Sequence, residues 1–117
     1  MDERLKKALD FSNYMITLNN QKRNLKEKYR EQIIFYYKGS QFTVTKELMT
    51  FVRMLVDSDY VEDVVLIDDN EIPVIVEHLE TFFDDILDVY FSATNNFHAE
   101  YEKIKQNRSV EKLTDYE

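Results

Sequence analysis

The chain has one glycine, Gly39, and one proline, Pro73, among its 117 residues. Both residue types are far below their average use in globular proteins. Glycine and proline are the residues that most often interrupt regular structure, so a chain this poor in them favours long continuous elements. The same scarcity excludes a glycine-rich phosphate-binding loop, because such a loop needs several glycines.

Two stretches have the apolar periodicity of long helices, residues 2–32 and residues 77–106. The stripe of the first consists of Ala8, Phe11, Met15, Leu18, Leu25 and Tyr29, and is widened by Leu5, Leu9 and Ile16. The stripe of the second consists of Leu79, Phe83, Ile86, Tyr90, Ala93, Phe97, Tyr101 and Ile104. Such stripes are seams along which helices pack against each other, and we expect Phe83 and Phe97 to be buried there. A helix of this length extends roughly 45 Å, so one end is expected to project or to meet another chain.

Two β-hairpins are predicted between the long helices. In the first, β-branched and aromatic residues of segments 33–37 and 41–44 flank a turn at 38–40, where Gly39 can adopt positive φ without steric cost. In the second, the apolar segments 64–67 and 72–76 flank a polar turn. Pro73 cannot donate a hydrogen bond to a ladder, so its strand is expected at a sheet edge.

A short helix is predicted between the hairpins, with Thr45 as its N-cap and Val56 near its end. Its apolar residues recur at the spacing of one helix face: Leu48, Phe51, Val52, Leu55 and Val56. The expected fold is therefore α+β and helix-dominated, in the order α-ββ-α-ββ-α, with the two long helices packed antiparallel. We expect a single domain over residues 1–106 and a polar C-terminal tail over residues 107–117.

Charge is distributed unevenly along the chain, whose net charge is −8. Residues 1–53 carry eleven Lys/Arg against six Asp/Glu, a net charge of +5. Residues 54–102 carry fourteen Asp/Glu and no Lys or Arg, a net charge of −14. A stretch of this length without one positive side chain is unusual, and it indicates a surface that selects its neighbours by charge.

Two charged groups are therefore candidate interaction residues. The basic group lies on the first long helix: Lys22, Arg23, Lys26, Lys28 and Arg30. The acidic group lies near the start of the second: Asp84, Asp85 and Asp88. The two groups could neutralise each other within one chain, or between chains that assemble. Charge would then set register and association rate, while the apolar seams supply the affinity. We expect a protein partner, in the first place a second copy forming a homodimer.

Nucleic-acid or transcription-machinery binding is the alternative, because the same five basic residues could neutralise phosphates. Tyr29, Phe35, Tyr36 and Tyr37 could stack on bases, although such residues are more often core or cross-strand pairs. An isoelectric point near 4.8 argues against nucleic acid as the main partner, because the acidic surface competes for the basic residues.

Motifs for catalysis or metal binding are missing from the sequence. There is no cysteine, and no serine stands in a Gly-x-Ser-x-Gly setting. His78 and His98 are predicted on one helix roughly 30 Å apart, too far to share a metal, so a structural role is expected for each. The acidic clusters at 57–63 and 68–71 lack the spacing and the glycine of a calcium loop. We expect a solvated acidic surface there, no enzyme activity, no cofactor, no metal and no small-molecule substrate. A carboxylate site for a divalent cation such as Ca²⁺ or Mg²⁺ in these loops is the alternative.

The charged N-terminus lacks the apolar core of a signal peptide, and no apolar run approaches the roughly 20 residues that span a bilayer. A cytoplasmic location is therefore expected.

Three segments of the sequence resemble small proteins encoded by marine T-even-like tailed phages. They are Met-Asp-Glu-Arg-Leu-Lys-Lys-Ala-Leu-Asp-Phe-Ser-Asn-Tyr at residues 1–14, Val-Leu-Ile-Asp-Asp-Asn-Glu-Ile-Pro-Val-Ile-Val-Glu at 65–77, and Tyr-Glu-Lys-Ile-Lys at 101–105 followed by Arg-Ser-Val-Glu-Lys-Leu at 108–113. None is a catalytic motif, so the resemblance implies no activity. It implies expression in a bacterial host cytoplasm and, by analogy, a role in virion assembly or host takeover.

Overall fold

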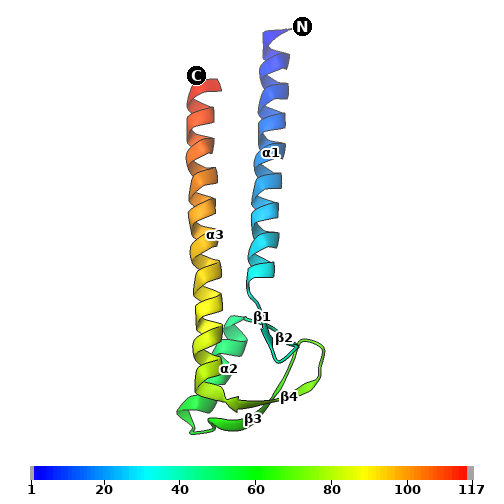
Figure 1. Ribbon diagram of the computed structural model, residues 1–117. Coiled ribbons are helices and arrows are strands. Elements are labelled where there is room, and N and C mark those ends of the chain that lie inside the picture. Colours follow the sequence, from blue (N-terminus) through cyan, green and yellow to red (C-terminus); the bar gives the residue numbers. More distant parts are fainter. Residues whose placement is uncertain (1, 116–117) are drawn as a thin grey trace. The chain divides into compact units, whose positions relative to one another are not determined.

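The computed structural model describes the backbone of residues 2–115 and the side chains of residues 2–107. Within this range the elements are α1 (Glu3–Gln32), β1 (Ile34–Tyr37), β2 (Ser40–Thr43), α2 (Lys46–Asp57), β3 (Glu62–Ile67), β4 (Pro73–His78) and α3 (Leu79–Asp115). This is the predicted order α-ββ-α-ββ-α, and the predicted helix-dominated α+β class is confirmed (Figure 1).

The chain divides into two compact units, which are described separately. Unit 1 contains residues 1–29 and 95–117, and unit 2 contains residues 30–94. The long helix α3 continues past the predicted end at Gln106 as far as Asp115. No glycine or proline occurs between these positions to end it. The single domain over 1–106 and the separate tail over 107–117 stay predictions.

Unit 1 consists of helical segments from α1 and α3, which run antiparallel side by side (Figure 1). Tyr29 meets Phe97 edge to face, with ring centroids 5.1 Å apart. Seven residues before Tyr29 on α1, the ammonium group of Lys22 lies 5.9 Å from the ring centroid of Tyr101, which is four residues after Phe97 on α3. Of the predicted seam of α1, Leu18 and Leu25 are buried and Met15 and Tyr29 are partly buried, whereas Ala8 and Phe11 are exposed.

The first hairpin of unit 2 pairs β1 with β2, from Ile34 opposite Thr43 to Tyr37 opposite Ser40. Its turn has two residues, Lys38 and Gly39, with φ of 48° and 83°. Two successive positive φ angles are typical of the tight turns that match strand twist, and glycine lowers the steric cost. The predicted turn at 38–40 is thus one residue shorter in the structure, because Ser40 belongs to the ladder.

The second hairpin pairs β3 with β4, from Glu62 opposite His78 to Ile67 opposite Pro73. Pro73 is the first residue of β4, where the lack of a backbone N–H disrupts the hydrogen-bond ladder least. As predicted, β4 is an edge strand. The strands are longer than the predicted segments 64–67 and 72–76. Placing His78 on the second long helix was wrong, since it ends β4 and α3 begins at Leu79.

Asp69 joins the turn of the second hairpin to strand β2. Its carboxylate accepts hydrogen bonds from the Thr43 backbone N–H at 3.0 Å, the Thr43 hydroxyl at 2.6 Å and the Gln41 side-chain amide at 3.1 Å. Its own N–H donates to the Gln41 carbonyl at 2.9 Å. The neighbouring Asp68 is buried and closes the turn by accepting from the N–H groups of Asn70 and Ile72, both at 2.9 Å. The Asp69 side chain therefore connects the turn of the second hairpin to β2, and the Asp68 side chain stabilises that turn.

Helix α2 begins as predicted, at a Thr45 cap. The Thr45 hydroxyl accepts a hydrogen bond from the Leu48 N–H at 3.1 Å, which satisfies one of the unpaired donors of the first turn. Val52 is completely buried, and Leu48, Leu55 and Val56 are partly buried beside it. The apolar stripe predicted for this helix is therefore its packed face, except for exposed Phe51.

The core of unit 2 is centred on Phe82, which is 1% exposed. Its ring makes edge-to-face contacts with three aromatic rings of the first hairpin, at centroid distances of 5.7 Å to Phe35, 5.5 Å to Tyr37 and 5.3 Å to Phe42. Phe83 and Phe97, which the sequence placed on the seam, are both only partly buried, although Phe97 does pack on Tyr29 of α1 in unit 1. In unit 2 the first hairpin packs against the face of α3 that carries Phe82. Leu79 and Ile86 are also buried there.

Candidate interaction surfaces

The basic residues of the predicted interaction group are partly engaged within unit 1. The Lys28 ammonium lies 2.6 Å from a carboxylate oxygen of Glu100, and Lys22 lies over the Tyr101 ring. Arg23 donates a hydrogen bond to the side chain of Asn20, one turn away, at 3.1 Å. Lys26 and Arg30 are exposed. The basic run is therefore only partly available to an external partner.

The acidic residues of the predicted group lie on the first turns of α3 in unit 2. Asp84, Asp85 and Asp88 are exposed, and among the residues that the structure describes none of them forms an ion pair. The base-to-acid pair between α1 and α3 is formed by Glu100 instead. Sequence reasoning missed it because Glu100 is isolated and not part of an acidic cluster.

A second apolar stripe lies on the N-terminal half of α1. Leu5, Leu9 and Ile16 are 52%, 46% and 56% exposed. At 3.6 residues per turn these three positions share one line along the helix, roughly 170° around it from buried Leu18 and Leu25. We call these three residues the outer stripe. The sequence had suggested that they widen the seam, but they face away from it.

The second hairpin has apolar residues on both faces. Leu66 and Val76 are buried on the inner face, whereas Val65, Ile67 and Ile75 are 56%, 60% and 57% exposed on the other, together with exposed Pro73. We call these four residues the hairpin face. Val65 and Ile75 are cross-strand partners there, as are Ile67 and Pro73. The sequence signal was the unbroken apolar run of each strand, which is typical of strands covered on both sides.

Exposed carboxylates lie at the ends of the strands that form the hairpin face. Residues 57–80 contain nine Asp/Glu and no Lys or Arg, and Glu62, Asp63 and Glu71 of this stretch are exposed at the strand ends. One base does reach the hairpin, since the Lys38 ammonium lies 2.9 Å from Glu77. Hydrogen bonding between these two groups raises the pKa of Lys38 and lowers that of Glu77, so both are charged at neutral pH. The positive charge of Lys38 is therefore already paired with the Glu77 carboxylate.

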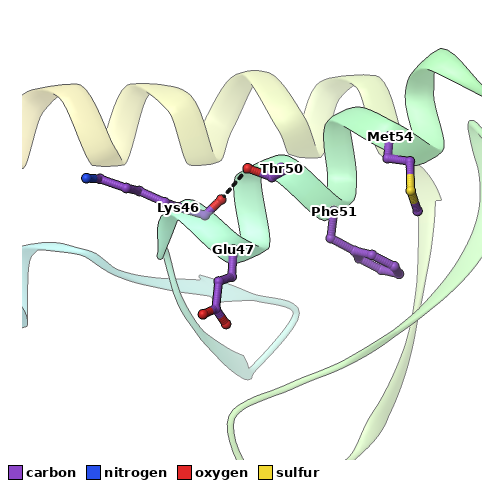
Figure 2. Close-up of a pocket in the computed structure, with 5 residues that line it drawn as sticks. All are labelled: Lys46, Glu47, Thr50, Phe51 and Met54. Carbon is purple, nitrogen blue, oxygen red and sulfur yellow. Dashed lines mark hydrogen bonds between the residues drawn. The ribbon is translucent and has the colours of Figure 1, made fainter.

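A shallow hollow of about 460 Å³ follows one side of α2 (Figure 2). Its lining comes from Lys46, Glu47, Thr50, Phe51 and Met54. The Thr50 hydroxyl donates to the Lys46 carbonyl at 2.7 Å, so this polar group is used within the helix. Ligand sites usually combine polar groups that converge from several elements, and the lining described here comes from one.

The histidines and acidic clusters do not assemble into a chemical centre in the part of the chain that the structure describes. No group of three or more His, Asp or Glu side chains there could hold a metal ion. His98 is exposed and lies 3.7 Å from Glu102, one turn further along α3. Likewise, no helix within the described range combines the length and apolar character needed to cross a membrane.

The pH dependence of stability should report the Asp69 contacts. Partial burial would raise the pKa of the Asp69 carboxyl, but hydrogen bonds from Thr43 and Gln41 outweigh it and hold this pKa below its usual value. The stabilisation is then complete above the unfolded-state pKa of about 3.9 and is lost as pH falls through the lower folded-state pKa. We expect urea denaturation to show wild type more stable than Asp69→Asn at pH 7, with the gap closing towards pH ~2.5.

An exposed carboxyl on α1 provides the control for this experiment. The variant Glu31→Gln, measured over the same pH range, gives the change that accompanies removal of one exposed carboxyl outside the Asp69 contacts. A gap between wild type and Asp69→Asn that does not change with pH would show that the carboxylate is not what Thr43 and Gln41 require.

Comparison of the chain with models of protein families, with curated protein sequences and with solved structures finds no match.

Proposed function

We propose that this chain is a non-catalytic protein–protein interaction protein that self-associates through the outer stripe of α1. The observation that supports the proposal is the exposure of Leu5, Leu9 and Ile16 on one line of the helix, opposite the residues that pack in unit 1. A helix on the surface of a globular protein normally has one apolar side. An apolar line on the opposite side therefore suits contact with a further helix.

A second copy of α1 fits the outer stripe, because the two copies then place the same apolar surface against each other. In a two-fold symmetric dimer the same patch of each subunit contacts its counterpart, which is the commonest arrangement of soluble oligomers. Two helices from each copy would give a four-helix bundle, in which side chains of both pairs share one core. The association would bury the outer stripe and remove its apolar surface from water.

The charged residues support assembly more than nucleic-acid binding. Lys22 and Lys28 already contact Tyr101 and Glu100, which leaves fewer cations for phosphates. The exposed Asp84, Asp85 and Asp88 could set the register of a protein partner by attracting its bases. Expression by a phage and a part in virion assembly fit this proposal, and they rest on the sequence resemblance alone.

The oligomeric state of variants tests the proposal. Wild-type protein is expected to sediment as a dimer at micromolar concentration, and its melting temperature should rise with protein concentration. The double variant Leu9→Lys, Ile16→Lys places two like charges in the contact and should sediment as a monomer. Circular dichroism should show that this variant keeps its helices, because both positions are exposed within the chain.

Met54→Lys is the matched control, since Met54 is an equally exposed apolar residue on α2, 53% exposed. This variant should remain a dimer. A wild-type chain that sediments as a monomer at every concentration up to ~100 μM, or a lysine double variant that stays dimeric, would contradict the proposal.

A further inference from the structure

The hairpin face of β3 and β4 is an apolar surface without a cover in the part of the chain that the structure describes. Antiparallel sheets with one solvated face normally alternate apolar and polar side chains. Here Val65, Ile67 and Ile75 are more than half exposed, although the opposite face of the same strands is buried. Ile72, beside the face in the turn, is 54% exposed. Contiguous apolar surface rimmed by polar residues is typical of interaction sites.

The charge around the face determines what can cover it. The exposed carboxylates Glu62, Asp63 and Glu71 stand at its ends, and the nearby base Lys38 is held by Glu77. An approaching surface therefore meets apolar side chains within a negative rim. Like charges placed opposite each other in an interface are costly, and opposite charges speed association.

We propose that the hairpin face docks a cationic amphipathic segment of another protein, with apolar side chains on Val65, Ile67 and Ile75 and lysine or arginine side chains on the acidic rim. A second copy does not fit the same face, because two acidic rims would meet. Phosphate-bearing partners are repelled for the same reason. This proposal does not rest on self-association, since the outer stripe belongs to α1 and the hairpin face to unit 2.

The carboxylates of the rim and the apolar residues of the hairpin face have different roles in binding. Long-range attraction by the carboxylates guides the partner, and this part weakens as salt screens exposed charges. The apolar contacts with β-branched side chains are short-range and less sensitive to salt, and they hold the bound partner in place. Replacement of an apolar residue should therefore weaken binding at any salt concentration, whereas replacement of rim carboxylates should weaken it mainly at low salt.

Fluorescence anisotropy on the full chain tests this proposal with a labelled helical peptide of leucine and lysine that has leucine on one face. Its counterpart with glutamate in place of lysine serves as the comparison. We expect saturable binding of the lysine peptide that weakens as ionic strength rises, and no binding of the glutamate peptide. The double variant Val65→Thr, Ile75→Thr keeps β-branched side chains but removes apolar surface, and should weaken binding at least tenfold.

Matched charge variants separate the hairpin face from the net charge of the protein. The triple variant Glu62→Gln, Asp63→Asn, Glu71→Gln should bind more weakly at low salt and show a flatter salt dependence. A control variant removes three exposed carboxylates from α1 instead, Asp10→Asn, Glu27→Gln and Glu31→Gln, and should bind like wild type.

Three results would overturn the proposal. The first is binding by the threonine double variant as tight as by wild type, and the second is equal weakening in the control triple variant. The third is dissociation of a wild-type dimer by the threonine substitutions, which would place a second copy on this face. Failure of self-association through α1 would be seen separately, in the sedimentation of the Leu9→Lys, Ile16→Lys variant.

Discussion

Replacing Phe82 with alanine is expected to lower the free energy of unfolding by about 3–5 kcal/mol. The Phe82 side chain is 1% exposed, and it is the common neighbour of the Phe35, Tyr37 and Phe42 rings. Alanine would leave a cavity between α3 and the first hairpin that these rings could fill only in part. It would also remove three edge-to-face contacts, each of which contributes beyond simple burial.

Urea denaturation followed by circular dichroism measures this loss, and the adjacent residue gives the control. Phe83 is only partly buried, and its ring lies 5.8 Å from the guanidinium carbon of Arg53. We expect Phe83→Ala to cost clearly less than Phe82→Ala. Equal losses in the two variants would mean that Phe82 is not the centre of this core. The variant Phe82→Leu should recover part of the stability, because it refills most of the volume.

Replacing Asp69 with alanine should have the next largest effect, about 1–3 kcal/mol. The substitution leaves three donors without their acceptor: the Thr43 N–H, the Thr43 hydroxyl and the Gln41 amide. The lower half of this range is expected, because Asp69 is exposed and water can replace part of what is lost. Unfolding in urea at pH 7 measures the loss.

A double-mutant cycle identifies the contact responsible. Thr43→Val removes the hydroxyl that lies 2.6 Å from the Asp69 carboxylate but keeps the shape of the side chain. We expect the effects of Asp69→Ala and Thr43→Val to be less than additive, with a coupling energy of about 0.5 kcal/mol or more. Strict additivity would show that the two side chains act independently.

The order of elements could be predicted because local signals mark several of the boundaries. Gly39 permits the positive φ of a tight turn, Thr45 accepts from the Leu48 N–H, and Pro73 stands at the start of an edge strand. Each of these signals depends on a few neighbouring residues, so no knowledge of the packing was needed. The continuation of α3 past Gln106 shows the limit, since a polar composition alone does not end a helix.

The choice of buried residue could not be predicted on α3, because the helix is apolar on several sides. Phe82 and Phe83 differ by 100° around the helix axis, and periodicity allows either to face a core. The first hairpin decides between them through Phe35, Tyr37 and Phe42, which are distant in sequence. The outer stripe was missed for a different reason. Helical spacing does separate Leu5, Leu9 and Ile16 from Leu18 and Leu25, but only their exposure in the structure shows that they are not covered within the described chain.

The charge pattern predicted part of the candidate site. It indicated that bases of the first long helix could meet carboxylates of the second, within one chain or between chains, and Lys28 with Glu100 is such a pair within the chain. It did not identify Glu100 as the acidic partner. A cluster such as Asp84, Asp85 and Asp88 can be recognised in a sequence, whereas nothing in the sequence distinguishes one single carboxylate from another. The hairpin face was visible as an apolar run, but its exposure depends on the tertiary structure.

The placement of carboxylates at the ends of β3 and β4 also matters before the chain has folded. Segments of β-branched residues such as 64–67 and 72–76 are the kind that stack between unfolded chains into fibrils. Acidic residues flank both segments, with Glu62 and Asp63 before the first, Asp68 and Asp69 after it, Glu71 before the second and Glu77 after it. Such flanking charges oppose aggregation, because stacked copies would bring like charges together. The residues proposed to attract a partner would thus also protect newly synthesised chains from one another.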